Sequence, residues 1–201
     1  MDEQVRYFTI EGEGEGFYKE KGSKFIAYAY QVNSEEEIKQ RLEALRKQYY
    51  DARHHCYAFQ LGLEQPVIRA NDDGEPNHSA GDPILGQIRS FGLTNVLVVV
   101  VRYFGGTKLG VGGLITAYKT AAFEALNGLD QKEIVPAERF VIHYTYEETP
   151  AVERVMKQFE LFDIDRLFEQ SCELKAGIRP EMKEALQALA TDLQLNLEWL
   201  S

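Results

Sequence analysis

The hydrophobic pattern of the last third of the chain alternates between the period of a strand and the period of a helix. Strand-like segments carry apolar residues at every second position, and helix-like segments carry one apolar stripe at spacings of three and four. A proline stands near the start of both helix-like segments, where its missing N–H is tolerated. The predicted elements are a strand over 140–146, a helix from 149, two strands within 162–178, a helix from 180 and a strand over 195–199. This βαββαβ order predicts a ferredoxin-like plait for a domain over residues 135–201.

Residues 1–134 predict a second α+β domain with a less regular pattern. Its most apolar run, residues 96–101, contains only Val and Leu, which is typical of a strand buried on both faces. Ser34 followed by Glu37 is a capping box and predicts a helix start. The other predicted elements are strands over 24–32 and 54–63, a polar turn over 71–81, helices over 83–91 and 114–126, and a loop at the Gly-Glu repeat of residues 12–16.

Composition indicates a globular protein and excludes several classes. Of 201 residues, 44% are apolar and 27% are charged, which argues against a disordered chain. No apolar run is long enough for a membrane-spanning helix. Cys56 and Cys172 cannot make a disulfide framework, and residues 1–4 do not begin a secretion signal. A cytoplasmic protein without a membrane partner is therefore expected.

The charge is acidic overall but unevenly distributed. The net charge is −10, from 22 Lys+Arg and 32 Asp+Glu, which argues against coating nucleic acid through bulk charge. Residues 83–123 nevertheless contain no Asp or Glu and carry +4, so the rest of the chain carries −14. An anionic partner is therefore expected only at this acid-free segment.

A glycine-rich turn lies inside the acid-free segment, at residues 102–113, between the buried strand and a helix. Glycines let a ligand approach backbone amides closely, and a helix start favours an anion. The spacing fits neither the P-loop nor the dinucleotide-binding fingerprint, and a turn whose glycines serve packing alone is an equal alternative. The candidate anion- or RNA-binding residues are Arg89, Arg102, Gly105, Gly106, Lys108, Gly110, Gly112, Gly113, Tyr118 and Lys119, with Tyr118 as a stacking partner.

The polar turn over residues 71–81 is a second candidate. Three carboxylates and an imidazole within seven residues could bind a hard cation or supply a general base. The calcium-loop spacing is not met, and Asp and Asn before Gly are common turn formers, so turn and helix-cap roles are favoured. The candidate residues are Asp72, Asp73, Gly74, Glu75 and His78.

His54 and Cys56 form the third candidate, since they share one face of a predicted strand. A Cys–His nucleophile or a zinc site would need further partners that the sequence does not place nearby. Buried strand residues are the favoured interpretation. No catalytic residue, metal ligand or cofactor is therefore predicted.

Five segments in residues 17–126 resemble the IMPACT/YigZ family. The most specific is residues 101–114, which read Val-Arg-Tyr-Phe-Gly-Gly-Thr-Lys-Leu-Gly-Val-Gly-Gly-Leu, and the others lie at 21–25, 53–58, 72–76 and 80–85. The resemblance implies an N-terminal domain similar to the second domain of ribosomal protein five of the small subunit. It also implies a C-terminal plait similar to a domain of elongation factor G.

The resemblance connects function with translation. Eukaryotic members modulate translation in amino-acid starvation by binding an activator of the kinase that phosphorylates an initiation factor, and an additional N-terminal domain is associated with that binding. Fewer than about twenty residues precede the match here, so this chain is expected to resemble bacterial two-domain members. The leading prediction is a non-catalytic, translation-associated protein that contacts structured RNA or a ribosomal surface. The alternatives are an enzyme or sensor for a small phosphorylated ligand at the glycine-rich turn, and a protein-interaction module.

Overall fold

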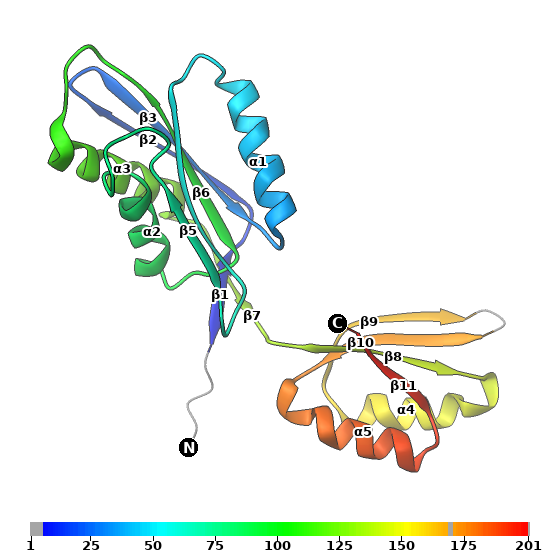
Figure 1. The fold of residues 1–201 in the computed structure, drawn as a ribbon. Coiled ribbons are helices and arrows are strands. Elements are labelled where there is room, and N and C mark those ends of the chain that lie inside the picture. Colours follow the sequence, from blue (N-terminus) through cyan, green and yellow to red (C-terminus); the bar gives the residue numbers. More distant parts are fainter. Residues whose placement is uncertain (1–5, 169–170, 201) are drawn as a thin grey trace, which may run out of the picture. The chain divides into compact units, whose positions relative to one another are not determined.

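The computed structural model describes residues 6–168 and 171–200 of the chain (Figure 1). The chain forms two compact units, Met1–Ile134 and Val135–Ser201, and each is described by itself. Residues 1–4, where a secretion signal is not expected, lie outside the described residues. Within the described ranges, no helix is long and apolar enough to cross a membrane.

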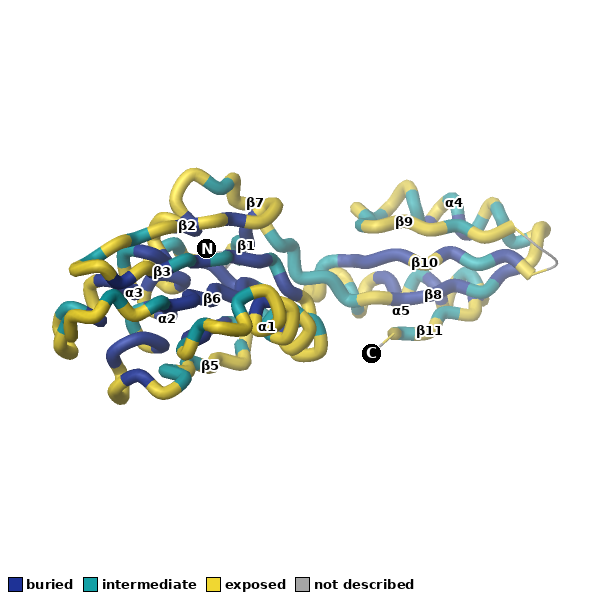
Figure 2. The backbone as a smooth tube through the Cα atoms, turned by 90° about the horizontal axis from the view of Figure 1, so that it is seen from above, coloured by how far each residue is buried: buried dark blue, intermediate teal, exposed yellow. Residues whose placement is uncertain are grey.

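A five-stranded antiparallel sheet organises the first unit, with the strand order β2-β3-β6-β4-β5. The most apolar strand, β6 (Val96–Tyr103), is therefore central, and its residues are buried from Val96 to Val101 (Figure 2). Its alternate residues belong to two different core clusters, so the strand is buried on both faces, as predicted. The other strands are β2 (Glu13–Glu20), β3 (Ser23–Gln31), β4 (His54–Leu61) and β5 (Val67–Asn71).

Helices cover both faces of this sheet, with α1 (Glu35–Gln48) on one face and α2 (Gly81–Ser90) and α3 (Gly110–Leu126) on the other (Figure 1). The predicted cap is present, because the Glu37 amide donates to Ser34 Oγ at 3.2 Å. The α3 helix begins at Gly110, four residues earlier than predicted, since glycines that resemble a turn in sequence form its first turn.

Three short strands of the first unit were not predicted. They are β5 and the pair β1 (Tyr7–Ile10) and β7 (Gln131–Ile134), which form a separate two-stranded sheet. Both β5 and β7 are mostly exposed, so neither shows the alternation of apolar residues that marks a half-buried strand.

The loop predicted at residues 12–16 is wrong, because residues from Glu13 onward belong to the edge strand β2. Alternate glycines of this strand face α3 and let the strand backbone lie directly on the helix. A Cβ on Gly14 would lie 2.0 Å from the Ala125 carbonyl oxygen, and one on Gly16 would lie 2.4 Å from the Ala121 carbonyl oxygen. Glycine at every second position therefore marks close strand–helix packing here and not flexibility.

The second unit confirms the predicted βαββαβ plait. Its antiparallel sheet has the order β11-β8-β10-β9, and two helices cover one face. The alternating residues of β10 that were predicted to face the core are all buried. The similarity to an elongation factor G domain stays a prediction. The elements are β8 (Glu138–Tyr144), α4 (Thr149–Gln158), β9 (Leu161–Phe168), β10 (Cys172–Ile178), α5 (Lys183–Asp192) and β11 (Asn196–Leu200).

Each helix of the plait is preceded by one 3₁₀ turn. Two residues that were predicted to lie on buried faces lie in these turns instead. Tyr146, expected on the buried face of the first strand, lies in η1 (Tyr146–Glu148) and is 70% exposed. The strand ends earlier because Thr145 and Glu148 form a capping box that starts a helical turn. Met182, expected in the stripe of the last helix, lies in η2 (Pro180–Met182) and is also exposed.

The packing of β2 on α3 predicts opposite effects of two Gly→Ala substitutions. We expect Gly16→Ala to lower the free energy of unfolding by about 1–3 kcal/mol, because its methyl group would overlap the α3 backbone. Gly86→Ala is the matched control, since Gly86 lies inside α2 with open space around it, and we expect a gain of about 0.5–1 kcal/mol. Urea unfolding of both variants measures the difference. Equal effects of the two substitutions would contradict the close contact.

Candidate functional site

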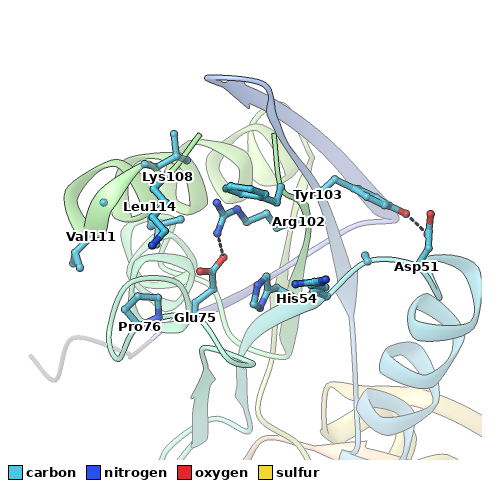
Figure 3. A pocket seen from close by; sticks show the side chains of 14 residues that line it. Asp51, His54, Glu75, Pro76, Arg102, Tyr103, Lys108, Val111 and Leu114 are labelled. Carbon is cyan, nitrogen blue, oxygen red and sulfur yellow. Dashed lines mark hydrogen bonds and ion pairs between the residues drawn. The ribbon is translucent and has the colours of Figure 1, made fainter. Parts of the chain in front are cut away.

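The glycine-rich turn and the acidic turn meet at one pocket of about 760 Å³ in the first unit (Figure 3). Glu75 of the acidic turn lines it, together with Arg102 at the end of β6. Lys108, Gly110 and Val111 line it from the glycine-rich segment and the first turn of α3. A cavity of this size is in the range of small-ligand sites in proteins.

A buried ion pair joins the two turns at this pocket. Arg102 Nη1 lies 2.5 Å from Glu75 Oε1, and the two side chains are only 7% and 4% exposed. The Tyr118 hydroxyl, on α3, donates to the same Glu75 oxygen at 2.8 Å. Glu75 therefore fixes the acidic turn to both β6 and α3, which form the two neighbouring sides of the pocket.

The prediction that Tyr118 is a stacking partner is wrong, because Tyr118 is fully buried and no base can stack on it. Its ring makes an edge contact with Phe25, with 5.1 Å between ring centroids, and its hydroxyl accepts a hydrogen bond from the Cys56 thiol at 3.3 Å. Burial raises the pKa of Cys56 well above its ordinary value. Cys56 thus stays a thiol, which agrees with its interpretation as a buried strand residue.

Asp72 and Asp73 form hydrogen bonds with backbone amides and do not line the pocket. The Asp73 carboxylate accepts a hydrogen bond from the His55 amide of β4 at 2.7 Å. The Asp72 carboxylate accepts hydrogen bonds from the amides of His78, Ala80 and Gly81 at 2.8–2.9 Å, which caps α2. Burial alone would raise the pKa of Asp72, but these three hydrogen bonds outweigh it and hold the pKa below its ordinary value. The structure thus bears out the turn-and-cap interpretation for Asp72. Among the residues that the structure describes, no cluster of three potential metal ligands exists.

The glycines of the glycine-rich turn serve different purposes. Gly105 is required for packing, since a Cβ there would lie 1.9 Å from the carbonyl carbon of Gly22. Gly106 and Gly110 have φ values of +88° and +72°, a region that favours glycine. Of the five predicted glycines, only Gly110 lines the pocket.

The predicted candidates divide into those at the pocket and those outside it. Arg102, Lys108, Gly110 and Glu75 line the pocket. His54 also lines it, and its Nδ1 lies 2.9 Å from the Asp73 carbonyl oxygen. The candidates outside the pocket lining are Arg89, Gly105, Gly106, Gly112, Gly113, Tyr118, Lys119, Asp72, Asp73, Gly74 and His78.

The start of α3 borders the pocket. Its N-cap residue, Leu109, offers no side-chain acceptor, and its first turn contains no acidic residue. The buried Nε of Arg102 also has no hydrogen-bond partner among the described residues. A buried donor that stays without a partner costs about 1–3 kcal/mol, so an acceptor at this position would be stabilising.

The pocket is locally positive in an acidic protein. Three cations, Arg53, Arg102 and Lys108, line it against two carboxylates, Asp51 and Glu75, so the lining carries +1 while the whole chain carries −10. The Asp51 carboxylate accepts a hydrogen bond from the Tyr103 hydroxyl at 2.7 Å, and this bond raises the pKa of Tyr103 to about 12.

Sequence reasoning missed Asp51 and Arg53 as pocket residues. Arg53 was within a segment that carries the family resemblance, but its place at the pocket depends on the pairing of the following strand, β4, with β6. Asp51 lies in the turn before β4 and shows no local pattern that could have singled it out.

Comparisons with known proteins match both the pocket-bearing region and the whole chain. A family model described as the Impact N-terminal domain matches residues 21–126, which include every residue that lines the pocket. The chain is 32% identical over 189 residues to "IMPACT family member YvyE" of Bacillus subtilis, which covers 93% of this chain and 86% of that protein. It is 34% identical over 140 residues to "IMPACT family member YigZ" of Escherichia coli, which covers 69% of each. A solved crystal structure of a hypothetical protein is 27% identical with a TM-score of 0.72 over 98% of both chains.

The buried ion pair predicts that Glu75→Gln is strongly destabilising. We expect a loss of about 3–5 kcal/mol in the free energy of unfolding, because the buried Arg102 charge loses its partner. The double variant Glu75→Gln with Arg102→Met should lose less than the sum of the two single changes. Glu13→Gln is the control, since the Glu13–Arg41 pair is exposed and should contribute about 1 kcal/mol or less. Denaturant unfolding measures all four variants, and equal effects of Glu75→Gln and Glu13→Gln would refute the structural role.

The cap formed by Asp72 predicts a pH-dependent stability. We expect Asp72→Ala to lower the free energy of unfolding by about 0.5–2 kcal/mol near neutral pH. Because the folded pKa is below the unfolded one, this stabilisation is complete above about pH 4 and is lost as the pH falls through the folded pKa. Unfolding of wild type and variant along a pH series should show the difference shrinking at acid pH. A difference that stays constant down to about pH 2 would exclude the charge as its cause.

Proposed function

The chain belongs to the IMPACT family, and from this membership we propose that it is a non-catalytic, translation-associated regulator that contacts structured RNA through its first unit. Family membership supports the link with translation, because eukaryotic members act in translational control. The observation that supports RNA as the partner is the acid-free segment of residues 83–123 in an otherwise acidic chain.

The acid-free segment presents exposed cations and apolar side chains on its helices. Ile115, Lys119 and Phe123 are exposed and four residues apart along α3, so they lie on one side of the helix. We call these three residues the α3 face. The Phe123 ring lies 5.7 Å from that of Phe91, which follows α2, and Arg89 is exposed in the last turn of α2. Exposed cations suit RNA phosphates, and an exposed aromatic ring suits an unpaired base.

The state of the titratable groups favours binding over catalysis. Glu75 is the acidic-turn carboxylate at the pocket, and its Oε1 already accepts hydrogen bonds from Arg102 and Tyr118. Burial holds Cys56 as a thiol, and Asp72 caps a helix. These three groups, which resembled acid–base or nucleophilic machinery in the sequence, are thus engaged in holding the fold.

The proposed RNA contact predicts a salt-dependent affinity that depends on two lysines. We expect the double variant Lys108→Glu with Lys119→Glu to weaken binding to a structured RNA. The slope of log affinity against log salt should decrease by about 0.7–0.9 for each phosphate contact removed. Fluorescence anisotropy over a salt series measures both quantities.

The matched control carries the same change in net charge on the opposite face of the sheet. Lys39→Glu with Lys47→Glu reverses two exposed lysines of α1 and should keep most of the affinity. Equal losses in both double variants would show only a bulk charge effect. Absence of wild-type binding to structured RNA and to ribosomal subunits at low salt would reject the proposed function.

A further inference from the structure

We propose that the pocket at the start of α3 binds one nucleotide unit, with the phosphate at the N-terminus of α3 beside Arg102 and Lys108 and the base against Phe104. This inference deepens the proposed RNA contact and rests on it for the source of the nucleotide. The unit could be the end of an RNA chain or a free mononucleotide, since both offer the same phosphate and base.

The phosphate position follows from the start of α3. Gly110 and Val111 open this 17-residue helix and line the pocket. The first amides of a helix have no partners within it, and here the N-cap residue, Leu109, has no side-chain acceptor for them. Such a helix start attracts an anion through its free N–H groups and its dipole.

Arg102 independently indicates an anionic ligand at the same place. Its side chain is more than nine-tenths buried, yet Nε has no hydrogen-bond partner among the described residues. Figure 3 shows its guanidinium group reaching between Glu75 and the side of the pocket formed by Lys108 and Leu114. Buried donors in folded proteins nearly always have partners, so an incompletely satisfied guanidinium group at a pocket is consistent with a ligand that supplies acceptors.

The remaining charges at the pocket also favour an anion. Glu75 is compensated by Arg102 and by the Tyr118 hydroxyl, and Asp51 accepts a hydrogen bond from Tyr103. Arg53 and Lys108 have no ion-pair partner within residues 6–168 and 171–200. Lys108 and the helix start thus make the α3 side of the pocket positive, and Arg53, just before β4, adds a further positive charge to the lining.

An exposed aromatic ring distinguishes a nucleotide from inorganic phosphate. Phe104 lines the pocket but is 57% exposed, and the guanidinium carbon of Arg102 lies 5.7 Å from its ring centroid. Nucleobases stack on aromatic rings irrespective of base identity. A phosphate subsite and an open ring within one pocket of about 760 Å³ match the two ends of a mononucleotide.

Substitutions at Val111 test the phosphate subsite without disturbing the buried ion pair. Val111 is half-exposed in the first turn of α3, where an aspartate is favourable for the helix but would add a negative charge to the helix start that is proposed to hold the phosphate. Val111→Asn has nearly the same shape as Val111→Asp without the charge, so the ratio of their affinities isolates electrostatic repulsion. With adenosine monophosphate as the probe in calorimetric titration, we expect Val111→Asp to bind about tenfold or more weakly than Val111→Asn.

Substitution of Phe104 tests the base subsite. We expect Phe104→Ala to weaken adenosine monophosphate binding severalfold and to leave the weaker binding of inorganic phosphate unchanged. Phe17→Ala is the matched control, because Phe17 is equally exposed but lies on β2 and does not line the pocket. Thermal unfolding confirms that each variant is folded. Absence of wild-type binding at millimolar nucleotide, equal affinities of the two Val111 variants, or an unchanged affinity of Phe104→Ala would overturn the inference.

A second set of titrations identifies the source and separates this inference from the proposed function. A short RNA with a 5′-phosphate that binds more tightly than adenosine monophosphate, and loses that advantage in Val111→Asp, supports an RNA end as the ligand. Tighter binding of the free mononucleotide supports a small-molecule ligand at the same site. RNA binding that is identical in both Val111 variants rejects the pocket but keeps the RNA contact. Nucleotide binding at the pocket without any RNA binding rejects the proposed function but keeps the pocket.

Discussion

The ion pair between Arg102 and Glu75 determines the geometry of the pocket. It joins the end of the central strand to the acidic turn, which lie 27 residues apart in the chain. Both side chains are buried, and a buried charge is tolerated only while its partner is present. Because Glu75 also accepts a hydrogen bond from Tyr118, the position of the acidic turn depends on β6 and α3 at once. The glycine-rich segment and the acidic turn therefore face each other at a fixed separation.

The polar groups behind this ion pair extend from the pocket into the core. The Cys56 thiol, the Tyr118 hydroxyl and the Glu75 carboxylate form a continuous series of hydrogen bonds between the sheet and α3. Residue types that suggest catalysis in a sequence thus have a structural role, since each satisfies a buried neighbour. The pocket gains rigidity from this arrangement, and a rigid site binds a ligand without having to order its own side chains first.

The predictability of each element depended on whether its physical cause was local. The plait and β6 were predicted correctly because their apolar spacing reflects burial on one face or on both. The strand β2 was missed because its spacing signal is carried by glycines, which a hydrophobic pattern ignores. The burial of Tyr118 could have been predicted, since it lies on the Leu114–Ala121 stripe of α3. The partner of Arg102 could not have been predicted, because β6 and the acidic turn meet only in the folded chain.

The charge distribution determines how an anion can bind this protein. Of the four cations in the acid-free segment, Arg102 is neutralised by Glu75, and the exposed ones are Arg89, Lys108 and Lys119. Such a small positive area is screened beyond about 8 Å at physiological salt, while the rest of the surface is acidic. Long-range attraction of an anion is therefore weak, and an anion that binds here would depend on short contacts with helix amides, guanidinium and aromatic rings. The proposed nucleotide pocket would supply contacts of this kind.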